Sequence, residues 1–351
     1  MTLRRTAAVL AVMALSMGWM LPATAAPLQI PDPPREGLPP PGAPTVSAGS
    51  WVLYDADAEM TLASHLADEE RPMASTTKLM TAILTMKYGD LGDTVTVSGR
   101  AADVGEAEVG LVKGEQLPLR LLLTALVIRS ANDAAVAVAE HISGSVEEFV
   151  ELMNAEAEAM GLEHTHFDNP HGLDGESHYS SANDLLQMGL TAMAYPEFRQ
   201  MAATIETEFP DAPDGTERAL HSTNLMLETY PGTIGVKTGY TGQAGLVLVA
   251  GAAREGRTLF AVVMGSEGQR AHFSDAETLL DWGFSHYRSV AMVTSGTYQP
   301  PQPVRVETDL PPEPEPEPVV VTNVREVEEA PPRLLDALGW VGRWMARLDG
   351  G

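Results

Sequence analysis

The chain has 351 residues, of which 44% are apolar, so it can form a sizeable core in one large domain or two small ones. It contains no cysteine, which excludes disulfides, thiol catalysis and cysteine-ligated metal sites. Its 48 acidic and 22 basic residues give a formal net charge of −26, which argues against nucleic-acid binding because that function needs a basic surface.

The first 25 residues have the pattern of a secretory signal peptide. Arg4 and Arg5 form a charged start, residues 7–19 are mostly apolar, and a small-residue cleavage site follows at Ala23-Thr24-Ala25. The apolar run is short for a membrane span, which leaves an uncleaved anchor as the alternative. Residues 26–47 are rich in proline and glycine, and this composition predicts an extended linker.

Ordered structure is predicted from residue 48 onward, where periodic apolar residues alternate with capping residues and turns. Strands are predicted at 51–54, 61–64, 94–97, 204–209, 232–236, 246–253 and 258–264. Helices are predicted at 76–88, 117–128, 132–142, 146–160, 181–193 and 275–287. Strands at both ends of a helical middle indicate an α/β (α+β) fold in which helices flank an antiparallel sheet.

The composition changes again after residue 290. Residues 291–332 are dense in proline and glutamate, which predicts an extended, self-repelling spacer. Residues 333–351 have the pattern of an amphipathic helix that binds a membrane surface, with leucines and two tryptophans on one face and several arginines. A helix that docks on the folded domain or on a partner is the alternative.

A serine and a lysine lie three residues apart at the predicted start of the helix 76–88. Positions i and i+3 share one face of a helix, so Ser75 and Lys78 can meet in one pocket. The alternative for this pair is a helix cap followed by a surface lysine.

Two further motifs carry polar side chains that could join this pair. Ser130-Ala131-Asn132 interrupts an apolar helical run, which predicts that its serine and asparagine face a cavity. A turn capped by the same two residues is the alternative. Lys237-Thr238-Gly239 follows a predicted strand, and its glycine would let a ligand approach the backbone. Here the alternative is an edge strand with a solvated lysine.

Histidines at positions 164, 166, 171 and 178 raise the question of a metal site. Their spacing lacks the His-x-x-x-His and His-Glu-x-x-His patterns of zinc-binding helices, so no metal and no other cofactor is predicted. His178 is instead expected to order the turn before the helix that starts at Ser181.

The three motifs occur in this order, about 55 and 105 residues apart, and the combination is far more specific than any one of them. Flanking residues extend the pattern, at Gly114-Glu115, 167–173, 178–184 and 235–245. Together they resemble the D-alanyl-D-alanine carboxypeptidases, the low-molecular-weight penicillin-binding proteins, over about residues 48–290. The resemblance implies a catalytic domain over 48–290 with the fold of the serine β-lactamase and penicillin-binding superfamily: an antiparallel sheet flanked by helices plus a helical subdomain.

The resemblance also assigns roles to the motif residues. It implies that the catalytic residues are Ser75 as nucleophile, Lys78 as its base and Ser130 as the relay of a proton to the leaving amine. Burial and a nearby ammonium would lower the pKa of Lys78 enough for it to act as a base. The residues implied to bind substrate are Asn132, Lys237, Thr238, Gly239 and Tyr240.

These substrate-binding residues have different expected partners. Asn132 would bind the substrate amide, and Lys237 and Thr238 would bind the terminal carboxylate. The backbone N–H groups of Ser75 and Tyr240 would form the oxyanion hole. Many relatives have histidine in place of Tyr240, but only the backbone N–H is needed there. Larger relatives also have a C-terminal β-rich domain where this chain has its spacer.

The activity implied is that of a serine-type carboxypeptidase which trims the terminal D-alanine of peptidoglycan stem peptides. β-Lactam antibiotics would be acylating inhibitors, and the location would be periplasmic, peripheral to the inner membrane through residues 333–351. Three alternatives remain: a D,D-endopeptidase that cuts peptide cross-links, a class A-like β-lactamase and a non-enzymatic penicillin sensor. The β-lactamase is disfavoured because the stretch near Glu163 lacks the expected spacing of a deacylating glutamate.

Overall fold

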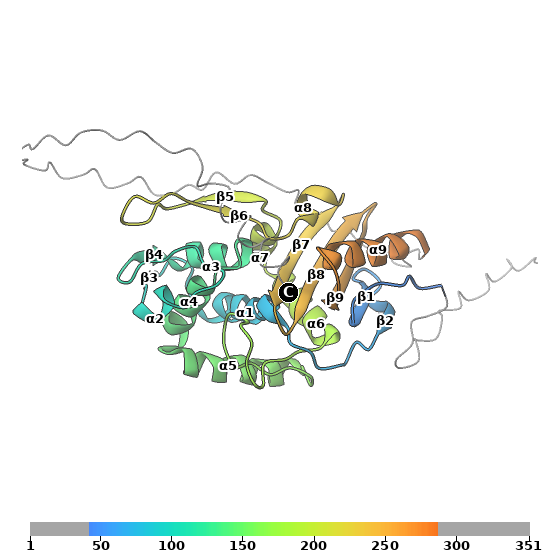
Figure 1. The fold of residues 1–351 in the computed structure, drawn as a ribbon, viewed down its shortest axis with the longest axis horizontal. Coiled ribbons are helices and arrows are strands. Elements are labelled where there is room, and N and C mark those ends of the chain that lie inside the picture. The colour runs from blue at the N-terminus through green and yellow to red at the C-terminus, as the bar shows by residue number, and fades with distance from the viewer. Residues whose placement is uncertain (1–41, 287–351) are drawn as a thin grey trace, which may run out of the picture. The chain divides into compact units, whose positions relative to one another are not determined.

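The computed structural model describes residues 42–286 (Figure 1). The signal peptide at 1–25, most of the linker at 26–47, the spacer at 291–332 and the terminal helix at 333–351 lie outside these residues and stay predictions. Between residues 42 and 286, no helix is both long enough and apolar enough to cross a membrane.

A five-stranded antiparallel sheet organises this part of the chain (Figure 1). Side chains alternate between the two faces of a strand, so Trp51 and Leu53 join the core under helix α9 (Ala271–His286), whereas Val52 joins the core on the opposite face. The strands, in spatial order, are β2 (Met60–His65), β1 (Ser50–Asp55), β9 (Arg257–Ser266), β8 (Gly245–Arg254) and β7 (Thr233–Thr241). The order leaves β7 as an edge strand, and it contacts the turn that contains Ser75.

The chain between β2 and β7 contains all of the described α-helices except α9. Its helices are α1 (Lys78–Tyr88), α2 (Gly99–Ala102), α3 (Leu119–Ile128), α4 (Asn132–Ser143), α5 (Val146–Met160), α6 (Ala182–Ala194), α7 (Pro196–Ala202) and α8 (Met226–Thr229). Two small two-stranded sheets pair β3 (Thr94–Thr96) with β4 (Gln116–Pro118) and β5 (Glu206–Phe209) with β6 (Arg218–His221). Helix α1 packs against α3, α4 and α6. The predicted fold class, an antiparallel sheet flanked by helices with a helical subdomain, is confirmed.

Several predicted boundaries are wrong. The helix expected at 117–128 begins only at Leu119, because Pro118 has extended backbone and pairs with β3. The strand expected at 204–209 begins at Glu206, because the Thr204 hydroxyl donates to the Gln200 carbonyl at the end of α7. The elements α2, α7, α8, β4 and β6 were not predicted, and each is short.

The largest difference concerns the strand expected at 232–236. It continues past Lys237 to Thr241 and pairs with β8 along this length. The lysine motif therefore lies inside an edge strand, and Lys237 is 2% exposed rather than solvated.

Candidate active site

Ser75 lies in a short 3-10 helix, Ala74–Thr77, that leads directly into α1. Two buried threonines fold this turn back on itself, since Thr76 donates its hydroxyl to the Met73 carbonyl (2.6 Å) and Thr77 donates to the Ala74 carbonyl (2.8 Å). The predicted α-helical start at 76 is wrong by two residues. The expected meeting of Ser75 and Lys78 is confirmed, because Lys78 Nζ lies 3.1 Å from Ser75 Oγ.

Lys78 is 1% exposed, and its Nζ has three oxygen neighbours. These are Asn132 Oδ1 (2.7 Å), the His171 carbonyl and Ser75 Oγ (3.1 Å). Burial, and next the charge of Lys237, hold the pKa of Lys78 well below its usual range. A neutral amine has two N–H groups and one lone pair. In that neutral form, donation to Asn132 Oδ1 and to the His171 carbonyl leaves the lone pair for the Ser75 hydroxyl, whereas in the charged form Nζ also donates to Ser75 Oγ.

Ser130 and Lys237 meet on the other side of the site. Ser130 sits in the link between α3 and α4 with a left-handed φ of 63°, which turns the chain sharply before Asn132. Lys237 donates from Nζ to Ser130 Oγ (2.9 Å) and to the Thr238 carbonyl (3.0 Å). Burial lowers the pKa of Lys237 to about 7.

Asn132 is held by the loop that follows α2. Its backbone N–H donates to the Ala107 carbonyl (2.6 Å) and its side-chain Nδ2 donates to the Gly105 carbonyl (3.1 Å). The next residue, Asp133, is fully buried and accepts the backbone N–H groups of residues 109–111. The sequence interpretation missed Asp133, although a carboxylate in a run of alanine and valine directly after the motif was a usable signal.

The motif on β7 passes close to the Ser75 turn. A Cβ added to Gly239 would lie 3.0 Å from the Ser75 backbone nitrogen and 3.1 Å from the Met73 carbonyl oxygen, so a side chain here would require the Ser75 turn to shift. The Thr238 hydroxyl lies 2.6 Å from the hydroxyl of Thr223, a residue that no motif indicated. Tyr240 is 42% exposed at the surface of the site. The structure therefore brings all eight predicted site residues into one region.

The loop over residues 168–178 is hydrogen-bonded to the Ser75 turn and to α1. His178 accepts the Asp168 N–H at Nδ1 (2.9 Å), so its Nε2 carries the proton and donates to Thr77 Oγ1 (2.7 Å). Burial lowers the pKa of His178 to about 4, which keeps it neutral. Beyond the expected ordering of its own turn, His178 thus ties this loop to the Ser75 turn. No group of acidic residues and histidines that could hold a metal is present between residues 42 and 286.

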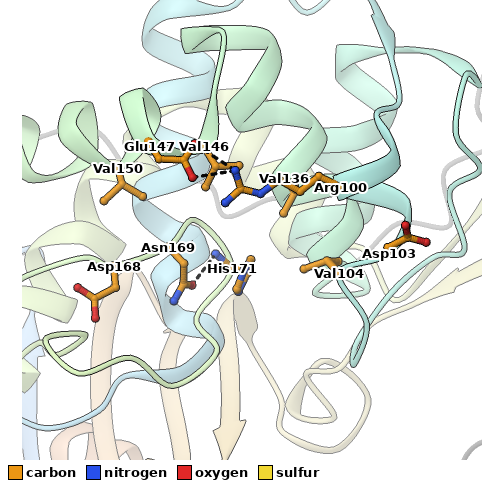
Figure 2. A pocket seen from close by; sticks show the side chains of 10 residues that line it. All are labelled: Arg100, Asp103, Val104, Val136, Val146, Glu147, Val150, Asp168, Asn169 and His171. Atoms are coloured by element: carbon orange, nitrogen blue, oxygen red, sulfur yellow. Dashed lines mark hydrogen bonds and ion pairs between the residues drawn. The ribbon is translucent and has the colours of Figure 1, made fainter.

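A pocket of about 470 Å³ adjoins these residues (Figure 2). His171 belongs to both regions, because its side chain lines the pocket and its carbonyl accepts from Lys78. Burial and the charge of Lys78 lower the pKa of His171 to about 3. The lining includes neither Ser75 nor Lys78, so this pocket lies beside the predicted catalytic residues and does not contain them. Its walls are Arg100, Asp103, Val104, Val136, Val146, Glu147, Val150, Asp168, Asn169 and His171.

Gly172 is expected to be essential for the position of the Ser75 turn. It has a φ of +93°, and an added Cβ would lie 2.1 Å from the Ala74 carbonyl oxygen. Gly172→Ala should therefore displace the turn and destabilise the protein by about 3 kcal/mol or more, from the left-handed backbone and the backbone clash together. Gly114→Ala is the matched control, with a φ of +85° but nothing within 4 Å. Thermal unfolding and penicillin acylation would test this, and equal effects of the two substitutions would contradict it.

Comparisons with known proteins agree with this geometry. Residues 39–268 match the family model described as D-alanyl-D-alanine carboxypeptidase, peptidase S11. The chain is 38% identical over 247 residues to the Bacillus subtilis D-alanyl-D-alanine carboxypeptidase DacF, a match that covers 69% of this chain and 63% of that protein. It is 37% identical to the Mycobacterium tuberculosis D-alanyl-D-alanine carboxypeptidase DacB2, over 72% of this chain and 86% of that one.

A solved structure extends the comparison to the fold. The Streptomyces K15 DD-transpeptidase superimposes with a TM-score of 0.66 at 31% identity, over 69% of this chain and 99% of that one. The residues that match the family model, 39–268, include the sheet, the helices α1 to α8 and the three motifs. The chain belongs to the D-alanyl-D-alanine carboxypeptidase family of serine peptidases, peptidase S11.

Proposed function

We propose that this protein is a serine-type D-Ala-D-Ala carboxypeptidase that releases the terminal D-alanine of peptidoglycan stem peptides through an acyl-enzyme on Ser75. One observation carries the proposal. Lys78 Nζ lies 3.1 Å from Ser75 Oγ while Asn132 Oδ1 and the His171 carbonyl occupy its N–H groups. This arrangement aims a lone pair at the serine hydroxyl, as a general base requires.

The reaction follows from the positions of the side chains. Ser75 Oγ attacks the carbonyl carbon of the penultimate D-alanine as its proton moves to Lys78 Nζ. When the tetrahedral intermediate collapses, the C–N bond breaks, Ser130 gives its proton to the departing amine, and Lys237 re-protonates Ser130 through their 2.9 Å hydrogen bond. Water then attacks the ester carbonyl and passes a proton through Ser130 to Lys237, while Lys78 returns its proton to Ser75 Oγ as the C–O bond breaks. The shortened peptide leaves, and both lysines regain their starting protonation.

The remaining site residues bind the substrate in this proposal. Asn132 orients the acyl-side amide, and Lys237 and Thr238 hold the terminal carboxylate beside Gly239. The backbone N–H groups of Ser75 and Tyr240 stabilise the oxyanion. β-Lactam antibiotics, which carry a comparable carboxylate, would acylate the same serine.

The Lys78 contacts favour a peptidase over a class A-like β-lactamase. In the described part of the chain no carboxylate hydrogen-bonds to Ser75 or Lys78, so a glutamate that activates the deacylating water has no counterpart next to them. Slow release of bound penicillin is the expected consequence.

An assay with two peptides tests the proposed activity. A pentapeptide with a free D-Ala-D-Ala end and a cross-linked dimer are each incubated with the protein, and mass spectrometry follows the products. Release of D-alanine from the pentapeptide is expected. Cleavage of the dimer alone would instead identify a D,D-endopeptidase, and penicillin labelling with no cleavage of either peptide would identify a penicillin sensor.

The pH dependence should separate the two lysines. Burial and the charge of Lys237 hold the pKa of Lys78 well below its usual range, whereas Lys237 loses its proton as the pH rises through about 7. A carboxylate substrate needs the charged form of Lys237, so kcat/KM should fall about tenfold per pH unit above about 7. A peptide with a C-terminal carboxamide should show a smaller fall, because only the re-protonation of Ser130 then needs the charged form of Lys237. Equal falls for both peptides would contradict this assignment.

The proposed location is the periplasm, at the inner-membrane surface. The composition of residues 1–25 supports export, and the amphipathic pattern of residues 333–351 supports surface binding. Deletion of residues 333–351 should move the protein from the membrane fraction to the soluble periplasmic fraction. A deleted form that stays with the membrane would contradict the surface-binding part.

A further inference from the structure

Thr223 joins the two walls of the proposed active site. It follows β6, and its backbone N–H donates to the carbonyl of Ile128, two residues before Ser130. Its hydroxyl lies 2.6 Å from the hydroxyl of Thr238 on β7. Thr223 is therefore bound at once to the helical wall that presents Ser130 and to the strand that presents Thr238.

The two hydroxyl groups cannot both donate across a single 2.6 Å contact. Each has one proton, so one threonine donates and the other accepts. A substrate carboxylate has no proton and only accepts hydrogen bonds. If Thr238 is to donate to that carboxylate, its own proton must point away from Thr223. The proton in the contact between the two threonines must then come from Thr223.

Neither Lys237 nor Arg218 replaces the Thr238 hydroxyl as a hydrogen-bond donor to the substrate carboxylate. Lys237 already donates to Ser130 and to the Thr238 carbonyl, which fixes two of its three protons in the charged form. Arg218, on the strand that precedes Thr223, is 5% exposed and paired with Glu115 at 2.5 Å. A carboxylate in this site therefore depends on Lys237 and on the direction of the Thr238 proton.

We propose that Thr223 is a positioning residue that donates to Thr238 and thereby directs the Thr238 proton at the substrate carboxylate. This selects substrates with a free C-terminal carboxylate over blocked or cross-linked ones. The inference rests on the proposed carboxylate-binding role of Thr238 and adds the residue that makes this hydroxyl a donor. A hydroxyl that accepts one hydrogen bond is also a stronger donor in the next.

The test compares Thr223→Val with Thr223→Ser. Valine keeps the shape and removes the donor, whereas serine keeps the hydroxyl. Each variant is assayed with a D-Ala-D-Ala peptide and with its C-terminal carboxamide. Thr223→Val should raise KM for the free acid about three- to tenfold, the value of one neutral hydrogen bond, with little change in kcat. The carboxamide kinetics should not change, and Thr223→Ser should behave like the wild type.

A second substrate pair keeps this test independent of the peptidase activity. A penicillin and its methyl ester provide the same contrast, read as the rate of acylation by mass spectrometry. A preference for the free acid that falls in Thr223→Val supports the inference even if no peptide is cleaved, which would count only against the proposed function. Thr223→Val added to Thr238→Val should cause no loss of the preference beyond that of Thr238→Val alone, because Thr223 acts only through the Thr238 hydroxyl.

Two results would overturn the inference. If Thr223→Val loses equal activity on the free acid and on its carboxamide or ester, Thr223 only connects the helical wall that carries Ser130 to strand β7. An unchanged preference for the acid would mean that the Thr238 proton needs no direction from Thr223.

Discussion

Replacement of Ser75 by alanine is expected to abolish both the release of D-alanine and covalent labelling by a fluorescent penicillin. The hydroxyl is the only group of Ser75 that the substitution removes, and covalent catalysis has no path without it. The loss in kcat should be on the order of 10⁴-fold or more, as for other serine nucleophiles. Intact-protein mass spectrometry should show the penicillin adduct on the wild type and none on Ser75→Ala.

The variant should fold normally, so the loss can be assigned to chemistry. Ser75 is half-buried, and the two other contacts of Lys78 Nζ, to Asn132 and to the His171 carbonyl, do not depend on it. Ser177→Ala is a suitable control, since Ser177 is exposed and contacts its neighbours through its backbone. Release of D-alanine by Ser75→Ala at more than a trace would show that another residue is the nucleophile.

Replacement of Lys78 by methionine is expected to cause the second-largest loss. Methionine fills a similar volume but cannot take the proton from Ser75. Loss of a general base costs on the order of 10² to 10⁴ in the rate of acylation. The acceptors Asn132 Oδ1 and the His171 carbonyl also lose their donor, which destabilises the fold by about 1–3 kcal/mol for each buried group left unpaired.

A comparison with Lys237→Met distinguishes the two lysines. Lys78→Met should slow acylation by a penicillin and by its methyl ester alike, because the base acts on Ser75 and not on the carboxylate. Lys237→Met should slow acylation mainly by the free acid. If Lys78→Met acylates within tenfold of the wild type, the proton acceptor is another group, and the path through Ser130 and Lys237 becomes the leading candidate.

Local sequence signals predicted the elements that are determined locally. Helix α5 has the predicted bounds, because Ser145 accepts the Glu148 N–H at its start and Gly161 adopts a left-handed φ of 72° at its end. At the start of the helix expected at 181–193, Ser181 accepts the Asp184 N–H in the same way. The Asp184 carboxylate accepts from the His164 N–H and the Thr165 hydroxyl, which no local pattern could indicate.

The motif residues were predicted from their types and order, but their environments were not. Lys237 is buried because β7 continues past it and because Ser130, 107 residues away in the chain, supplies its hydrogen-bond partner. The contact between His178 and Thr77 spans 101 residues. Thr223 belongs to none of the sequence motifs, and its hydroxyl can contact Thr238 only after β6 and β7 have folded into place.

The distances along the chain between partners also make the site a sensor of folding. Lys78 and Asn132 are 54 residues apart, and Ser130 and Lys237 are 107 residues apart, so no single helix or hairpin can assemble a reactive serine. Contacts between distant residues form late, since loop closure must precede them. The rate at which a refolding sample regains the ability to be acylated should therefore report the docking of β7 against the Ser75 turn and lag behind the recovery of helix content. A fluorescent penicillin would then count correctly assembled molecules in a mixture with misfolded chains.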